Sequence, residues 1–351
     1  MDVRPVAADV LNSTPLNTDV LIVGAGPAGS AAAIACASNG LKVVLCERER
    51  FPRERVGEAL HPGVESLLAQ LGAVERLAAV IGARFEGAEI DWAGDRRFVP
   101  FGSDADGPWR GFQVRRSAFD AMLLERAREV GVDVRNPCSG LEPIVEDRRV
   151  VGATTEAGPV RSRLVIDGSG PSRWLQRKLD LPSREHSPKL VVRYGYVRGE
   201  HPARDANPAV HGDATGWTWI ARVEPQRYQW VRLDLSEVER GRDWRPDALA
   251  ALSPEGPSKG AEMGWRISTA AGPGWMLVGD AVAMLDPTSS HGVLKALMSG
   301  FFAGQTAAAI LGDGSEAEGA AAYRQWVEGW FATDVRVLRA LYARLGASWA
   351  I

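Results

Sequence analysis

The apolar positions near the start of the chain follow the order strand, turn, helix, strand. Residues 18–23 form an apolar, β-branched run, which predicts a buried strand. Residues 30–39 are rich in alanine and end at Gly40, as expected for a helix that a glycine terminates. Residues 41–48 form a second apolar run and predict the next buried strand. This order within about 30 residues is that of one half of a dinucleotide-binding fold.

The hydrophobic period then changes several times. Residues 63–80 repeat with a helical period, and residues 84–101 alternate around a polar turn, which predicts a hairpin. Residues 117–130 predict a helix, with Ser117 as the expected N-cap and Asp120 at the capping-box position.

The second half of the chain contains a different pattern. Residues 189–235 alternate Trp, Tyr, Arg and Val, which is typical of an antiparallel sheet with one face in water. Residues 245–262 are polar and contain Pro and Gly, so they predict helix and loop. Residues 274–282 predict a buried strand, residues 292–311 an apolar helix rich in small residues, and residues 318–351 one or two amphipathic helices.

Together these elements predict an α/β protein of two interlocked domains and a helical end. A Rossmann-type, three-layer nucleotide-binding domain is expected to be discontinuous, over residues 18–83, 110–188 and 263–317. A β-rich substrate domain interrupts it, over residues 84–109 and 189–262, and a helical segment of residues 318–351 follows. This arrangement predicts a pocket between the two domains.

Composition limits the classes of partner. The 351 residues carry a formal net charge of −3, and arginines are scattered among acidic residues, so we expect no nucleic acid as a partner. No apolar run predicts a membrane span, and the start of the chain lacks a signal-peptide pattern, so we expect a cytoplasmic protein. Cys36, Cys46 and Cys138 show no CxxC spacing, and the widely separated histidines predict no metal site.

A glycine motif lies in the turn after the first strand. Gly24, Gly26 and Gly29, with Ala28 between the last two, form GxGxxG. The glycines permit a tight turn, close approach of a pyrophosphate to the backbone, and close packing of helix on strand. The helix N-terminus would then face the phosphates, and Glu47, at the end of the second strand, is suited to accept the ribose 2′-OH.

A second motif separates FAD from NAD as the ligand. Residues 279–287 read GDAVAMLDP, and here the chain resembles the single-Rossmann FAD enzymes, which include aromatic hydroxylases, flavin-dependent halogenases and geranylgeranyl reductases. The resemblance implies that Asp280 holds the ribityl chain and that the turn at Pro287 runs beside the flavin ring. It also implies that the helix beginning at Gly292 and Val293 points its positive end at the flavin.

Further residues carry the same resemblance, which covers residues 18–60, 110–175 and 272–300. Arg55 matches the family's pyrophosphate arginine, and Arg116 matches the residue at the head of the following helix. Glu47 and Arg48 match its pair of residues at the end of the second strand.

Departures from the halogenase pattern bear on the reaction. Trp217 and Trp219 match the first part of the halogenase WxWxIP stretch, but Ala221 and Arg222 replace its Ile-Pro. The hairpin contains no lysine, and Ser289 stands where halogenases have a glutamate. We therefore expect hydroxylation of an indole-like or other aromatic ring in preference to halogenation. Residues 286–297 also resemble the hydroxylases that mature tryptophylquinone cofactors, which implies a Trp side chain of a partner polypeptide as one possible substrate.

The resemblance implies a reaction in which reduced FAD and O2 form a C4a-hydroperoxide, whose distal oxygen an electron-rich ring attacks. His291 and His61 are the expected acid/base residues, since an imidazole titrates near neutrality. Trp92, Trp217 and Trp219 are candidates either to stack on the substrate or to fill the core.

The electron donor and the class of reaction stay open at this stage. A second GxGxxG is absent, so NAD(P)H either binds transiently or a separate flavin reductase supplies the electrons. A geranylgeranyl-reductase-like enzyme, a flavin-dependent halogenase and a flavin-holding assembly factor remain alternatives to a monooxygenase.

Overall fold

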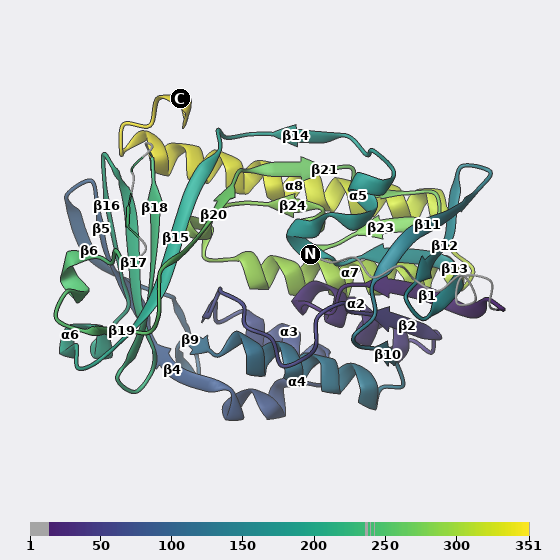
Figure 1. Cartoon of the computed structure of the whole chain (residues 1–351), viewed down its shortest axis with the longest axis horizontal. Coiled ribbons are helices and arrows are strands. Elements are labelled where there is room, and N and C mark those ends of the chain that lie inside the picture. Colours follow the sequence, from purple (N-terminus) through teal and green to yellow (C-terminus); the bar gives the residue numbers. More distant parts are fainter. Residues whose placement is uncertain (1–13, 236–237, 239, 242, 351) are drawn as a thin grey trace.

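Two large sheets lie side by side in the computed structural model, which describes residues 14–235, 238, 240–241 and 243–350 (Figure 1). The first contains a parallel ladder in the order β10 (Asp133–Arg135), β2 (Val43–Cys46), β1 (Leu16–Val23), β13 (Gly158–Asp167) and β23 (Trp275–Leu277). The first half of β13 continues into an antiparallel extension formed by β12 (Arg149–Thr155) and β11 (Gly140–Glu146). β22 (Ala271–Gly272) pairs with β23.

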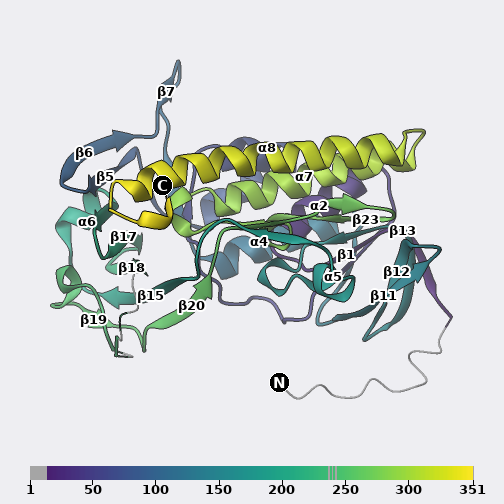
Figure 2. The ribbon, with the colours of Figure 1, turned by 90° about the horizontal axis from the view of Figure 1, so that it is seen from above.

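Helices cover the parallel ladder. They are α2 (Pro27–Ser38), α3 (Val64–Gln70), α4 (Arg116–Glu129), α5 (Trp174–Lys178), α7 (Gly292–Leu311) and α8 (Glu316–Ala343), and α8 runs along the outside of α7 (Figure 2). The α/β Rossmann-type architecture is as predicted, and residues 292–311 form one helix as expected.

The second sheet has the order β19 (Ser253–Pro254), β15 (Leu190–Arg198), β18 (Arg227–Asp234), β17 (Gly216–Glu224), β16 (Ala209–Asp213), β5 (Gly87–Trp92) and β6 (Asp95–Pro100). An eighth strand, β20 (Lys259–Met263), also pairs with β15. Residues 245–262, predicted as helix and loop, contribute β19, β20 and a short 3-10 turn at Asp247–Leu249. The polar strand β20 escaped prediction because only pairing with β15, far away in sequence, makes it a strand.

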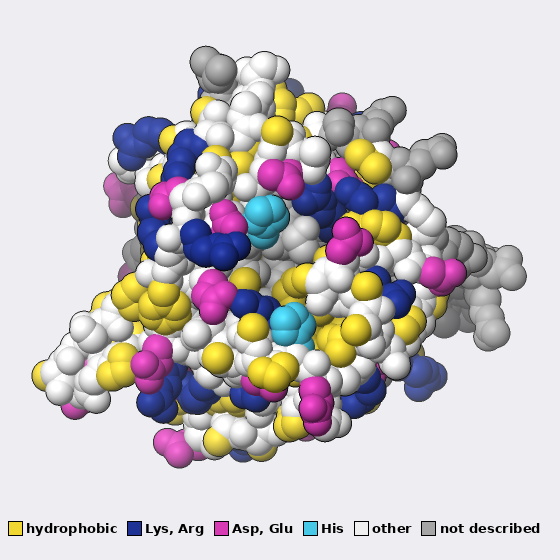
Figure 3. Space-filling view, turned by 90° about the vertical axis from the view of Figure 1, so that its left-hand side faces the viewer, with side chains coloured by type: hydrophobic (Ala, Val, Ile, Leu, Met, Phe, Trp, Pro, Cys, Tyr) yellow, Lys and Arg dark blue, Asp and Glu magenta, His cyan; other side chains and the backbone are white. Residues whose placement is uncertain are grey.

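Two small three-stranded sheets complete the fold. One contains β3 (Ala59–Leu60), β9 (Gly111–Val114) and β4 (Ile81–Phe85), and the other contains β14 (Ser183–Glu185), β21 (Arg266–Ser268) and β24 (Ala283–Met284). A short hairpin is formed by β7 (Ser103–Asp104) and β8 (Gly107–Pro108), and α6 (Pro202–Ala206) connects β15 with β16. Figure 3 shows the end of the molecule formed by the second sheet, where positive and negative side chains are interspersed.

Small residues let α2 and α7 cross closely. A Cβ at Gly300 would lie 2.0 Å from the Ala28 carbonyl oxygen, and one at Gly304 would lie 2.6 Å from the Ala35 Cβ. By length and hydropathy α7 is the one helix of the described residues that would be able to span a membrane. It packs closely on α2, and a cytoplasmic location stays a prediction.

The start of α4 differs from the prediction. Its N-cap is Arg115, which makes no capping hydrogen bond through its side chain, and Ser117 already lies inside the helix. Asp120 is fully buried and is bound by arginine side chains, so its carboxylate is not used for capping. The reason is tertiary, because the arginines approach Asp120 from the loop before β3 and from the first turn of α4.

Candidate functional site

The glycine loop between β1 and α2 is built for close contact. Gly24 has a φ of 100°, and a Cβ there would lie 2.4 Å from the Gly168 carbonyl oxygen. A Cβ at Gly29 would lie 1.8 Å from the Gly24 carbonyl oxygen. Gly26 is the N-cap of α2 and makes no side-chain capping bond, so the first N–H groups of the helix remain available to a phosphate.

Glu47 lies beside this loop with its carboxylate held by the backbone. Its Oε2 accepts a hydrogen bond from the Ala25 N–H at 2.9 Å, and its Oε1 accepts one from the Glu49 N–H at 2.8 Å. The residue therefore lies at the loop end of β2, where an acid is able to accept a ribose hydroxyl.

Arg53, which the sequence analysis did not select, lies over the glycine loop. Its guanidinium is 3.7 Å from Glu47, 3.6 Å from Asp120, and 3.6 Å from a Cβ placed on Gly26. The side chain is only 9% exposed, and its Nε has no hydrogen-bond partner among the described residues. Burial lowers the pKa of Arg53, although the two carboxylates oppose this effect.

The two arginines predicted beside the loop lie further out. Arg55 is 40% exposed and pairs with Glu49, and Arg48 is 49% exposed with its Nε 3.7 Å from the same carboxylate. The structure thus places Arg53, and not Arg55, against the glycine loop. Both residues belong to one charged loop without periodicity, so only the path of the folded loop separates them.

Arg116 is anchored at the start of α4. Its Nε and Nη2 donate to the two carboxylate oxygens of Asp120 at 2.9 and 3.1 Å, and its Nη1 donates to the Val56 carbonyl oxygen at 2.7 Å. Asp120 therefore links Arg116 to Arg53, and the two cations are placed together.

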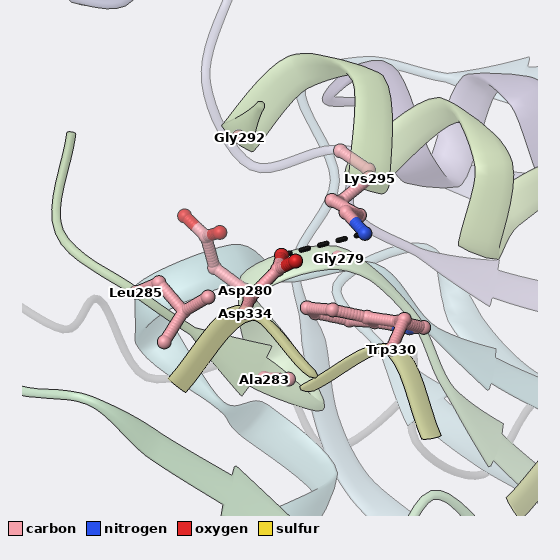
Figure 4. Close-up of a pocket in the computed structure, with 9 residues that line it drawn as sticks. Gly279, Asp280, Ala283, Leu285, Gly292, Lys295, Trp330 and Asp334 are labelled. Atoms are coloured by element: carbon pink, nitrogen blue, oxygen red, sulfur yellow. Dashed lines mark ion pairs between the residues drawn. The ribbon is translucent and has the colours of Figure 1, made fainter. Parts of the chain in front are cut away.

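Asp280 lies between the parallel sheet and the start of α7. Asp280 lines a cavity of about 30 Å³ together with Gly292, Lys295, Trp330 and Asp334 (Figure 4). Burial raises the pKa of Asp280, while Arg266 and Arg116 act in the opposite direction. A polar ligand in this recess would therefore be held by a carboxyl and by the first turn of α7.

Lys295 is the lysine that lines this cavity. Its Nζ is 3.4 Å from the Asp334 carboxylate and 4.6 Å from the ring centre of Trp330. Figure 4 shows the ammonium group directed at Asp334, which lies beside it on α8. The other four lysines, Lys42, Lys178, Lys189 and Lys259, have exposed side chains.

His61 and His291 come together at the start of α7. Their ring centres are 5.0 Å apart, and His61 Nδ1 accepts a hydrogen bond from the Gly63 N–H at 3.0 Å. His291 is the N-cap residue of α7 and makes no side-chain capping bond. Burial lowers the pKa of both imidazoles, so both are neutral near pH 7 and can accept a proton. The two predicted acid/base residues are thus neighbours.

Two of the three candidate tryptophans belong to the core. Trp92 and Trp217 are each 2% exposed, and their indole N–H groups donate to the Leu341 carbonyl oxygen at 2.9 Å and to the Tyr342 hydroxyl at 2.8 Å. Both rings pack against α8, so of the two predicted roles, stacking on a substrate or filling the core, they take the second. Trp219 is only half-buried and remains a candidate to contact a ligand.

Glu58 is a buried acid that the sequence analysis did not select. It is 3% exposed and accepts hydrogen bonds from the Tyr196 hydroxyl of β15 and the Gln229 amide of β18. Burial raises the pKa of Glu58, and the hydrogen bond from the Tyr196 hydroxyl opposes the rise. The carboxyl therefore joins the loop before β3 to the second sheet. Its position directly after Gly57 was the only sequence signal.

The residues present fit FAD. Arg53, with its unpartnered Nε, and the uncapped N-terminus of α2 would hold the pyrophosphate, and Glu47 would hold the adenosine ribose. Asp280 would bind the ribityl chain, and the uncapped N-terminus of α7 at Gly292 would face the flavin ring.

Comparison with known proteins agrees with this assignment. Residues 19–175 match the family described as FAD dependent oxidoreductase. A 1H-pyrrole-2-carbonyl-[peptidyl-carrier protein] brominase of Pseudoalteromonas luteoviolacea is 29% identical over 89% of this chain and 82% of its own length. A tryptophan 2-halogenase of Chondromyces crocatus is 27% identical over 93% and 68%. The structure of the myxobacterial chondrochloren halogenase superposes with a TM-score of 0.84 at 25% identity, over 93% of this chain and 83% of that chain.

By its match over residues 19–175 the chain is an FAD-dependent oxidoreductase, and it is similar to flavin-dependent halogenases. The prediction of an FAD-dependent oxidoreductase with FAD as cofactor is therefore confirmed, and the similarity to halogenases matches one of the predicted alternatives. The further resemblance to hydroxylases that mature tryptophylquinone cofactors finds no support in these comparisons.

Proposed function

We propose that the protein is a monooxygenase that hydroxylates an electron-rich aromatic ring. The observation that carries the proposal is the pair of neutral imidazoles, His61 and His291, at the flavin end of α7. A halogenase of the lysine-dependent kind needs a free amine near the substrate. Four of the five lysines are exposed, and the fifth, Lys295, is paired with Asp334.

The inner face of the second sheet supports an aromatic substrate. Tyr194, Val231 and Trp219 stand opposite one another on β15, β18 and β17, so their side chains form one row across three strands. Tyr194 and Trp219 are half-buried. Trp217, two residues from Trp219 on the same face, donates to Tyr342, so this face is turned toward the C-terminal end of α8.

The names of two relatives agree with this substrate class, because pyrrole and indole are electron-rich nitrogen heteroaromatics. We propose an indole-like ring as the first substrate to test, either free or as a Trp side chain in a polypeptide.

Bound and reduced FAD would supply the activation of O2. One oxygen atom enters the ring and the other leaves as water, with two electrons from NAD(P)H, delivered directly or through a separate reductase. The chain's own residues exclude water, orient the ring against the row on the second sheet, and handle protons at His61 Nε2 and on the imidazole of His291. Nδ1 of His61 is occupied by the Gly63 N–H, which leaves Nε2 for this exchange.

The test is to reduce the FAD-loaded protein without oxygen and to mix it with oxygenated buffer and indole or tryptophan, with and without bromide. The proposal predicts a product that is one oxygen atom heavier, with a yield independent of bromide. His291→Gln should slow its formation at least tenfold. His211→Gln is the matched control, because His211 is an exposed residue of β16. A product that carries bromine, or slow reoxidation without product at every substrate tried, would overturn the proposal.

Halogenation is the second candidate, and one observation favours it. The cavity of about 30 Å³ beside the N-terminus of α7 contains the ammonium group of Lys295, and its size suits a halide ion or O2. Asp280 and Asp334 line the same cavity and disfavour an anion there. If halogenation is the reaction, Lys295→Met should abolish the bromide-dependent product.

A further inference from the structure

The C-terminal end of α8 is inserted between the second sheet and the turn that precedes α7. The hydroxyl of Tyr342 lies 2.8 Å from Thr288 Oγ1 and accepts a hydrogen bond from the Trp217 indole N–H at 2.8 Å. Tyr342 is fully buried. One hydroxyl group therefore connects a residue of the Asp286–Pro287 turn with a residue of β17.

The turn itself is held from two further sides. Asp286 is 1% exposed, and its carboxylate accepts hydrogen bonds from the Trp265 indole N–H at 2.5 Å and from the Thr288 N–H at 2.8 Å. The Tyr342 hydroxyl also interacts with this carboxylate. Thr288, Asp286 and Tyr342 thus form one network.

Aromatic packing fixes the Tyr342 ring. Trp92 contacts it edge-on with ring centres 6.2 Å apart, and Trp265 and Trp349 pack at 5.6 and 5.3 Å. The Trp92 N–H donates to Leu341 of the same helix turn. Hydrogen bonds therefore connect the C-terminal end of α8 to β5 and β17 of the second sheet, while the Tyr342 hydroxyl reaches the Asp286–Pro287 turn.

We propose that Tyr342 is a positioning residue that sets the Asp286–Pro287 turn beside the flavin and couples this turn to the substrate sheet through Trp217. The phenol acts as a neutral donor. Burial and the Asp286 carboxylate raise its pKa well above the usual value, so that it holds its proton throughout the working range of pH. A shift of β17 when a substrate binds would move the Trp217 N–H, and this hydroxyl would transmit the shift to the turn. The inference needs bound FAD but not a particular oxidation reaction.

The test uses Tyr342→Phe, which keeps the ring and its packing and removes only the hydroxyl. Tyr323→Phe is the matched control, because Tyr323 is also a fully buried tyrosine of α8 and donates to the Leu277 carbonyl oxygen at 2.8 Å. For each holoprotein we would measure the visible spectrum of bound FAD, its dissociation constant, its reduction potential and the thermal unfolding temperature.

We expect both variants to lose thermal stability, and Tyr342→Phe to lose more, since its hydroxyl has three partners and that of Tyr323 has one. Only Tyr342→Phe should shift the flavin absorption bands and the reduction potential and weaken FAD binding, by roughly fivefold. Thr288→Val removes the same contact from the other side. The variant that combines Tyr342→Phe and Thr288→Val should therefore bind FAD no more weakly than whichever single variant has the lower affinity for FAD.

Three outcomes overturn the proposal. They are a wild-type flavin spectrum and affinity in Tyr342→Phe, equal flavin effects in Tyr323→Phe, and additive losses of affinity in the double variant. If Tyr342→Phe does not fold, Thr288→Val alone supplies the flavin measurements and the same decision.

Discussion

Replacing Arg53 tests which arginine of the charged loop binds the cofactor. Arg53→Met keeps most of the length of the side chain and removes the guanidinium, and Arg55→Met makes the same change two residues away. The structure predicts that only Arg53→Met weakens FAD binding, because Arg53 lies against Gly26 while Arg55 is exposed and paired with Glu49.

The expected size follows from the contacts. A hydrogen bond to a charged group contributes about 1.5–3 kcal/mol. Removing the guanidinium also removes the cost of burying it, so we take about 2 kcal/mol, which is roughly 30-fold in the dissociation constant. The fold should survive, since the contacts of Arg53 to Glu47 and Asp120 are long and Asp120 keeps both hydrogen bonds from Arg116 at 2.9 and 3.1 Å.

In the assay each apoprotein is titrated with FAD, and binding is detected by the quenching of flavin fluorescence. Thermal unfolding of the apoproteins is the control for folding. Raising the salt concentration should weaken binding less in Arg53→Met than in the wild type, because one charge contact is already absent. If Arg55→Met weakens FAD binding as much as Arg53→Met does, the assignment of Arg53 is wrong.

Three further predictions concern the loop and the imidazole pair. Gly29→Ala should abolish FAD binding and destabilise the apoprotein by about 1–3 kcal/mol, measured by denaturant unfolding, since its Cβ would lie 1.8 Å from a carbonyl oxygen. The rate of a reaction step that needs neutral His291 should fall only when the pH drops below the usual imidazole pKa. The reason is that burial, His61 and Lys295 lower the pKa of His291 more than Asp334 raises it. In His61→Phe this acid limb should move to higher pH, since a repelling charge is removed; an unchanged limb would show that the two imidazoles do not interact.

Much of the nucleotide-binding domain could be predicted because its signals are local. The glycine turn, the alanine-rich helix and the acid at the end of β2 lie within a short stretch, where backbone conformation and hydrophobic period decide the structure. The helix over residues 292–311 was predictable for the same reason, as its apolar pattern is continuous.

Three features depended on contacts between distant parts of the chain. The strand β20 exists only through pairing with β15, the burial of Trp92 and Trp217 depends on α8, and Tyr342 reaches the Asp286–Pro287 turn from the far end of the sequence. Sequence patterns report the period of one element, and they contain no information about which element packs against it.

The sequence by itself determined the class of fold and the glycine loop, the acid and the helix proposed to bind the cofactor, because these require particular residue types at short spacings. The choice of FAD came from the resemblance of residues 279–287 to a known family. The tertiary structure alone decided that Arg53 and not Arg55 lies over the glycine loop, that His61 meets His291, and that Trp217 supports α8. The physical reason is that side-chain partners across a fold are chosen by the path of loops and the packing of helices, which the local pattern of hydrophobic residues does not encode.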